Sequence, residues 1–405
     1  MLYDNVEKNK AASFLQERKE ACFIFYSVCF SSMGSNSRRR RREQNRQKPA
    51  NVTYKKQFLT FDKQIDLLRS RKMDIPEEDV SYARNLLGRI GYYRLSGYWY
   101  VYRQGEGQSP TPEEDFTPGV SLHDVENLYV FDRNLRILVF SAIESIEVAL
   151  RALIGHTLGS HGSMAHTDPS LFRDPFTKSA LDTEKLGTRH TAERYNWMRS
   201  KHYNWIKSAG RKTDRSKADF IRHFKDKYGM PLPIWVVTEV IDFSDLSRIY
   251  EGMVEKDRAT VATGLGVTDE EEKPLTESLR SWLRALTFVR NTCAHHSRLW
   301  NVNMVEQVAP SQPFPTPLQH LAKMSSGKHA RIYPTLAIIS FLTAQINPEL
   351  KWQEHIGNLI NNAPPVPDYL DRMGFPSNWD QLSVWRTGPS SLRPPPESRR
   401  IGWSQ

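Results

Sequence analysis

Arginine and histidine side chains gather in one short stretch of the chain, residues 288–301, which reads FVRNTCAHHSRLWN. A histidine titrates near neutral pH and can therefore move a proton during a reaction. An arginine stays positively charged and presents a planar set of donors that matches a phosphate group. Arg290 and His295 together can hold a phosphate group and move a proton. The structural alternative is that they only cap and bridge a bundle of helices.

A helix must position these residues, because apolar side chains recur at three- and four-residue spacing ahead of the motif and through it. The apolar positions are Leu279, Trp282, Leu286, Val289 and Cys293. At about 100° per residue, Asn291 and His295 fall on the same side of this helix. Arg290 lies near the edge of the apolar stripe, and His296 turns back towards it. We therefore expect His296 to pack against the core.

The motif resembles the R-x(4–6)-H signature of the HEPN superfamily of all-helical ribonucleases. Its longer form, Arg-Asn-x-x-Ala-His-His-x-Arg-Leu-Trp-Asn, looks like the version in Abi-like abortive-infection proteins of the AbiD/AbiF type. Further segments resemble the same family, so that the resemblance covers roughly residues 55–385. These segments are GYYRLSGYW at 91–99, DRNLR at 132–136, ESIEVALR at 144–151, and the stretches 234–247 and 373–385.

The resemblance implies an all-α fold: a HEPN-like helical bundle with an N-terminal helical extension and disordered termini. We expect a disordered basic tail over residues 1–54 and an N-terminal helical region over residues 55–118. The HEPN-like Abi domain is expected to span residues 119–385, followed by a disordered tail over residues 386–405.

Helical periodicity in the residues themselves predicts the main elements of this fold. Ser121 stands where it would cap the longest helix, with Asp124 three residues later in the capping-box position. The expected helices cover 61–68, 77–90, 122–158, a stretch from Pro274 through the motif, 332–346 and 352–359.

The activity implied by the resemblance is that of a metal-independent endoribonuclease in phage defence by abortive infection. In this chemistry a ribose 2′-OH attacks the adjacent phosphate, which leaves a 2′,3′-cyclic phosphate and a 5′-hydroxyl. Arg290 and His295 are then the catalytic pair, and Asn291 positions the helix or the phosphate. His296 is an alternative histidine at the Arg-x5-His spacing, and Arg298 is a candidate contact to the RNA backbone.

A carboxylate on the longest predicted helix is a candidate supporting residue. Glu147 and Arg151 are four positions apart and can pair along that helix. If the pair is on the surface, it contributes little to stability. The functional alternative is that Glu147, or its neighbour Glu144, orients the Arg–His pair across a helix interface. We favour Glu147 for this role.

The expected partners follow from the same resemblance. HEPN sites are composite, formed by two motif helices that face each other. We recognise a single Arg-x4-His motif, Arg290–His295, so the resemblance implies a homodimer with one site across its two-fold axis. RNA is the expected substrate, and an antitoxin or a non-coding RNA is a further candidate partner. The alternative function is a non-catalytic RNA-binding or regulatory protein of a defence or toxin–antitoxin system.

The positive charge of the chain is concentrated in one segment. The net charge is +10, and residues 33–56 alone hold nine Lys or Arg against one Glu. This segment is either a solvated tail or an arm that binds phosphates without sequence preference. The basic stretch 183–228 could also touch RNA, and the tyrosines of residues 91–99 either stack on bases or pack on the bundle. The expected RNA-binding arginines are Arg38, Arg39, Arg40, Arg41, Arg42 and Arg94.

Several other classes of protein are disfavoured. We find no phosphate loop of the Walker type and expect no cofactor. Cys293, His295 and His296 lie close together but lack the further ligands of a structural zinc site, so we expect no metal. No uncharged apolar run reaches the length of a membrane span, roughly 18 residues or more. Three cysteines without paired spacing favour a cytoplasmic protein.

Overall fold

The computed structural model describes residues 57–105, 114–178 and 200–386. The chain divides between Leu59 and Thr60, and the second unit, Thr60–Gln405, contains the motif. The predicted basic tail with Arg38 to Arg42 lies outside the described residues, as do residues 387–405. The disorder expected for both termini therefore stays a prediction.

The described residues form an all-α fold, as predicted. Their β features are isolated bridges, and several short connections are 3₁₀ turns. Among these residues, no helix is both long enough and apolar enough to cross a membrane. The α-helices are α3 (Phe61–Ser70), α4 (Val80–Ile90), α5 (Tyr92–Trp99), α6 (Leu122–Gly159), α7 (Asp174–Thr177), α9 (Lys201–Arg215), α10 (Asp219–Tyr228), α11 (Ile234–Val237), α12 (Phe243–Gly252), α13 (Glu255–Gly264), α14 (Thr276–Ala294), α15 (Ser326–His329), α16 (Tyr333–Ile346), α17 (Trp352–Asn361) and α18 (Tyr369–Met373).

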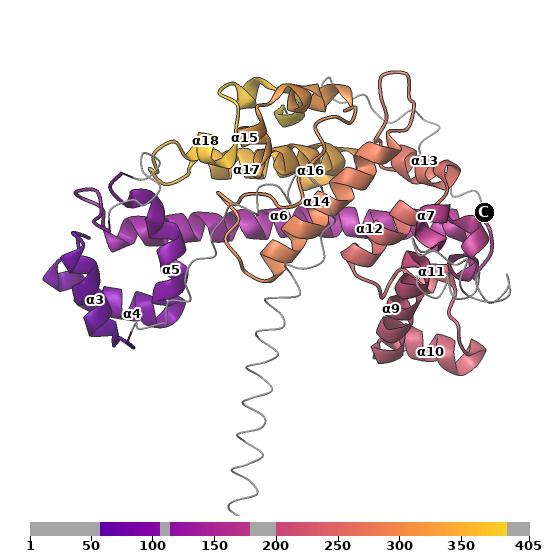
Figure 1. Cartoon of the computed structure of the whole chain (residues 1–405), viewed down its shortest axis with the longest axis horizontal. Helices are drawn as coiled ribbons and strands as arrows, with labels where there is room; N and C mark the ends of the chain where they lie inside the picture. The colour runs from indigo at the N-terminus through magenta and orange to yellow at the C-terminus, as the bar shows by residue number, and fades with distance from the viewer. Residues whose placement is uncertain (1–56, 106–113, 179–199, 387–405) are drawn as a thin grey trace, which may run out of the picture. The chain divides into compact units, whose positions relative to one another are not determined.

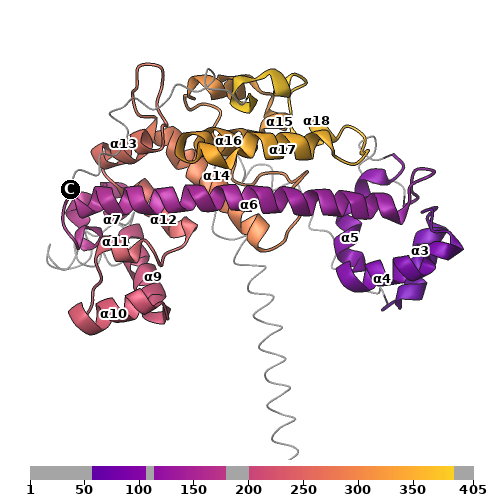
Figure 2. The same cartoon turned by 180° about the vertical axis from the view of Figure 1, so that it is seen from behind.

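Helix α6 is the element on which many helices of the second unit pack. It is 38 residues long and carries the predicted capping box, in which Ser121 and Asp124 satisfy each other's backbone N–H groups. It contacts α5, α11, α13, α14, α16 and α17. Figures 1 and 2 show α6 as the long helix beside which these elements lie.

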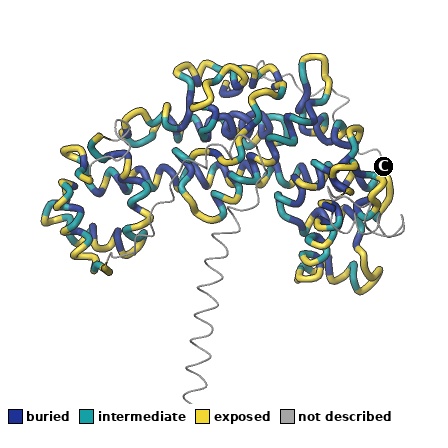
Figure 3. Tube along the Cα trace, in the orientation of Figure 1, coloured by how far each residue is buried: buried dark blue, intermediate teal, exposed yellow. Residues whose placement is uncertain are grey.

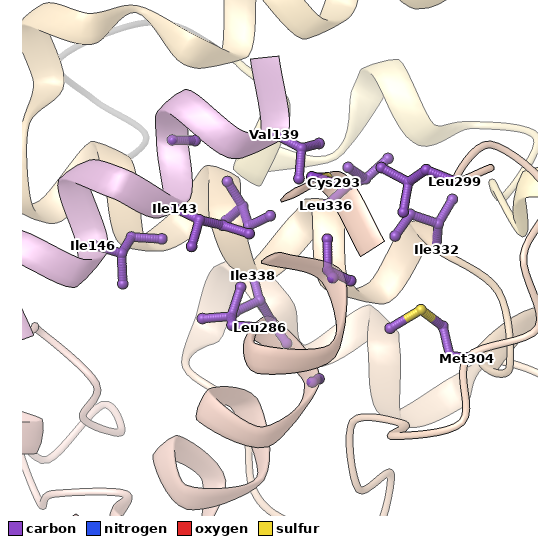
Figure 4. Packing of buried hydrophobic residues seen from close by; sticks show 14 of the residues in the cluster. Val139, Ile143, Ile146, Leu286, Cys293, Leu299, Met304, Ile332, Leu336 and Ile338 are labelled. Carbon is purple, nitrogen blue, oxygen red and sulfur yellow. The ribbon is translucent and has the colours of Figure 1, made fainter. Parts of the chain in front are cut away.

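The hydrophobic core of this unit lies where α6 meets α14 and α16. Val139 and Ile143 of α6 are buried beside Leu286 and Cys293 of α14 and Leu336 of α16 (Figure 4). Figure 3 shows the buried segments concentrated along these helices. The apolar stripe predicted for the motif helix is buried as expected: Leu279, Trp282, Leu286, Val289 and Cys293.

The motif helix α14 differs from its prediction at both ends. It begins at Thr276 rather than at Pro274, because Pro274 forms an isolated bridge with Thr268. It ends at Ala294, so the second half of the motif leaves the helix. Burial of the apolar stripe fixes α14 against α6, and this packing determines where Arg290 and His295 emerge.

Candidate functional site

Arg290 lies at the edge of the buried face of α14, as predicted. Its guanidinium carbon lies over the ring of Phe140 in α6, 5.7 Å from the ring centre, a distance at which cation and ring attract. Within the described residues its guanidinium donates no hydrogen bond, and its Nε is buried without one. The side chain is 30% exposed. Arg290 is therefore held in place and retains donors for a ligand.

Glu147 connects Arg290 to α6. Its Oε2 lies 3.9 Å from Arg290 Nε, and its Oε1 accepts a hydrogen bond from Arg151 Nη2, the pair predicted from the i,i+4 spacing. Arg151 also donates to the Thr238 carbonyl oxygen, just after α11. Because Glu147 and Arg151 are both largely buried, solvent screens their interaction less than that of a surface pair. The two residues thus bridge α6, α11 and α14.

A pocket of about 340 Å³ lies around Arg290. Its charged lining consists of Arg151, Arg290, Glu144, Glu147 and Glu239. Because the glutamates outnumber the arginines, this pocket does not favour a bound anion. Of these three carboxylates, Glu147 is the one that forms an ion pair with Arg290, and the exposed edge of the guanidinium remains the part that can meet a phosphate.

Asn291 and His295 are exposed at the end of α14. The His295 N–H donates to the Asn291 carbonyl oxygen at 2.9 Å, so the two residues stand one turn apart, as predicted. In the part of the chain that the structure describes, the His295 imidazole has no hydrogen-bond or ion-pair partner. It is therefore free to exchange a proton with a ligand.

The prediction that His296 packs against the core is wrong, because the helix ends two residues before it. The Ser297 N–H donates to the Thr292 carbonyl and the His296 N–H to the Cys293 carbonyl, which is the Schellman pattern of helix termination. This pattern needs a left-handed residue, and His296 supplies it with a φ of 55°. A non-glycine residue in this conformation costs about 1–2 kcal/mol. His296 is consequently exposed.

Helix α5, which contains the tyrosine-rich segment, docks on the loop that follows α14. Arg94 Nη1 donates to the His296 carbonyl at 2.6 Å, and Arg298 Nη1 donates to the Gly97 carbonyl. The hydrogen bond from Arg94 holds His296, the residue with the left-handed backbone, in place. Arg94 and Arg298, both predicted to contact RNA, therefore also fasten two motif segments to each other.

Asp132 in α6 is a buried junction between three segments, and the sequence analysis gave it no role. Its Oδ1 accepts the N–H groups of Leu299 and Trp300 at 3.0 and 2.7 Å. Its Oδ2 accepts from the Tyr98 hydroxyl at 2.7 Å and from Arg136. Burial raises the pKa of Asp132, and the charge of Arg136 opposes that rise. The signal that could have revealed it is a charged i,i+4 pair on the apolar face of a helix.

The sequence analysis also missed a second Arg-x4-His spacing, Arg151–His156 in α6. Both residues line a pocket of about 460 Å³ with Trp235, and Arg151 belongs to the Arg290 pocket as well. Arg290–His295 is therefore not the single Arg-x4-His spacing in the sequence, and the prediction of one such motif is wrong. A composite site needs two such motifs, and one chain contains two Arg-x4-His spacings. The number of motifs therefore does not by itself imply a homodimer.

The expected basic face over residues 183–228 falls partly on α9 and α10. Trp205 and Ile221 anchor these helices to the core, and their basic side chains differ in availability. Lys212 donates to the carboxylates of Asp242 and Asp245. The exposed Lys and Arg residues are Lys201, Lys207, Arg211, Arg215, Lys217, Arg222 and Lys227. Contact of this face with RNA stays a prediction.

Cys293 is enclosed by the core rather than presented to a ligand. Burial raises the pKa of its thiol to about 12, which keeps it protonated and unreactive near neutral pH. Among the described residues, no group of three or more His, Cys, Asp or Glu side chains has the arrangement of a metal site.

Comparison with known proteins gives one family match. The family model described as Abi-like protein matches residues 85–301, more than half of the chain. The matched part begins within α4, includes α5, α6 and α14, and ends at Asn301, the last residue of the motif. Comparison with curated proteins and with solved structures finds no match.

Proposed function

Because the chain belongs to the Abi-like protein family, which supports a role in abortive infection and phage defence, we propose that it acts there as a metal-independent endoribonuclease. The observation that carries this proposal is the pairing of groups at the end of α14. Among the described residues, the Arg290 guanidinium donates no hydrogen bond, and the His295 imidazole has neither a hydrogen-bond nor an ion-pair partner. The HEPN-like character of the helical bundle is part of the same proposal.

In the proposed reaction the ribose 2′-oxygen bonds to the adjacent phosphorus while the bond from phosphorus to the 5′-oxygen breaks. His295 moves a proton, either from the attacking 2′-OH or to the departing 5′-oxygen, because histidine is the side chain that most often does either task in enzymes. Arg290 stabilises the negative charge that grows on the phosphate oxygens. Neither role needs a metal ion.

Two further residues support the pair. Glu147 orients the Arg290 guanidinium from one side while Phe140 fixes it from another. Asn291 is exposed one turn before His295, where its side-chain amide can hydrogen-bond a phosphate oxygen. His296 follows His295 directly, and it is exposed with a left-handed backbone.

We also propose that a second copy of the chain completes the site. An exposed apolar stripe runs along α6 and includes Val130, Ile137, Phe140 and Val148. These positions fall on one side of a helix, and Phe140 is the ring over which Arg290 lies. In Figure 2 α6 is visible along its length with no other helix drawn in front of it. A copy seated on this stripe would therefore meet Arg290.

A non-catalytic RNA-binding function is the second candidate. It is supported by Arg94 and Arg298, which line one pocket and form no ion pair with any described residue. Under this alternative Arg290 and His295 bind RNA or support the fold, and substituting them changes binding rather than cleavage.

Phage challenge of cells that express the protein tests the proposed function. We expect wild-type protein to reduce the plaque count and Arg290→Ala/His295→Ala to give the count of an empty vector. Arg284→Ala/His355→Ala is the matched control, because it removes an exposed arginine and an exposed histidine outside the motif. Protection by the motif variant equal to that of wild type, at equal protein level, would refute the catalytic roles.

A further inference from the structure

Another pocket, between α5 and the loop at residues 296–298, has the opposite charge to the Arg290 pocket. Its volume is about 630 Å³, and its lining contains Arg94 and Arg298 but no carboxylate. Neither arginine forms an ion pair with any described residue. Two uncompensated positive charges in one concave surface favour a bound anion.

The two arginines are held ready for such a ligand. Each uses one Nη1 donor on a backbone carbonyl: Arg94 on His296, and Arg298 on Gly97. A guanidinium has five N–H donors, so each keeps most of them for a phosphate group. Because both side chains are already fixed, binding a ligand costs little further side-chain entropy.

Exposed aromatic rings stand beside these charges. Tyr93 is 90% exposed, and its ring contacts no other aromatic ring or cation among the described residues. Tyr100 is 40% exposed, with Arg103 5.7 Å from its ring centre. Tyr98 forms a wall of the pocket and is fixed by its hydrogen bond to Asp132. Tyrosine rings and arginine planes are the surfaces on which unpaired bases stack.

We infer that this pocket binds one nucleotide of a single-stranded RNA, with its base on Tyr93 and its phosphate on Arg94 and Arg298. The inference rests on the proposed function, because the loop that lines the pocket directly follows His295 and the bound strand would be the one that is cleaved. The carboxylates of an acidic peptide could pair with the two arginines but would not stack on the exposed ring. A duplex keeps its bases stacked inside the helix, where Tyr93 cannot reach them.

Fluorescence anisotropy with a labelled oligouridine of about ten nucleotides, within the site sizes of such proteins, tests this inference. The full-length chain carries Arg290→Ala/His295→Ala throughout, so that binding is measured without cleavage. Adding Tyr93→Ala should weaken binding about 5- to 150-fold, the effect of losing one stacked base. Tyr93→Phe should bind like its parent. Tyr228→Ala, which removes an exposed tyrosine of α10, is the matched control and should also bind like the parent.

A second variant tests the phosphate contact independently. Arg94→Gln should lower the slope of log affinity against log salt by about 0.7, the value for one phosphate of a single strand. Unchanged binding by both Tyr93→Ala and Arg94→Gln would overturn the inference, as would equal competition by polyglutamate or by duplex RNA. Loss of binding in Tyr228→Ala alone would move the site to α10. A protein that passes these tests yet never cuts RNA refutes the proposed cleavage and leaves the binding site standing.

Discussion

Arg290 owes its position to neighbours that lie far from it in the sequence. Phe140 and Glu147 both come from α6, and together they fix the guanidinium from two directions. Arg151 shares the carboxylate of Glu147, so that the charge facing Arg290 is already partly compensated. We propose on this ground that Glu147 is a positioning residue, which sets the direction of the Arg290 guanidinium.

Glu147→Gln should lower RNA cleavage about 10- to 100-fold, because a small displacement of a catalytic group costs that much. The amide keeps the shape of the side chain but loses the charge that attracts Arg290. Cleavage rates at saturating and limiting RNA give kcat and KM separately, and we expect the loss in kcat. Glu144→Gln is the control, since Glu144 lines the same pocket but forms no ion pair with Arg290. Equal losses in both variants would contradict a specific role for Glu147.

Residue types and spacing were sufficient to predict some of the site and not the rest. The Glu147–Arg151 pair and the shared side of Asn291 and His295 follow from helical geometry alone. The position of His296 did not follow, because periodicity assumes that the helix continues. A Schellman end usually contains glycine, and its absence here hid the stop signal.

At the scale of the elements, helices and loops are joined by polar contacts whose distant partners cannot be identified from a local sequence pattern. Asp132 binds the backbone of the loop after α14, the hydroxyl of Tyr98 and the guanidinium of Arg136. The helices themselves were predictable from their apolar stripes and from the cap at Ser121. Their docking was not, because it depends on which distant backbone groups a buried carboxylate can reach.

Asp132→Asn should lower the free energy of unfolding by about 3–5 kcal/mol, since it leaves the buried Arg136 without its counter-charge. Chemical denaturation followed by circular dichroism measures the change. Asp62→Asn serves as the reference, because it removes an exposed partner of Arg84 and should cost at most about 1 kcal/mol. If the two variants were equally stable, Asp132 would not be the junction described above.

At the scale of the whole molecule, the question is whether one chain or two chains form a catalytic site. The exposed stripe on α6 favours a second copy, while Arg151–His156 supplies another Arg-x4-His spacing within the same chain. The two arrangements differ in whether an isolated chain can cut RNA.

Ile137→Asp/Val148→Asp should convert a dimer into a monomer and abolish cleavage, because both side chains are exposed on the stripe. Light scattering after size-exclusion chromatography measures the mass. Val305→Asp, an equally exposed valine outside α6, should leave both properties unchanged. An active monomer would contradict the two-chain site and shift attention to His156.

The most direct test of the central claim is cleavage of RNA by the purified protein with EDTA present. Wild-type protein and the Arg284→Ala/His355→Ala control should cut and leave 2′,3′-cyclic phosphate and 5′-hydroxyl ends. Arg290→Ala/His295→Ala should cut at least about 10²- to 10⁴-fold more slowly while binding RNA, as expected for loss of general acid–base catalysis. Equal cleavage by wild type and the motif variant, or binding by both without any cleavage, would contradict the assignment of Arg290 and His295 as the catalytic pair.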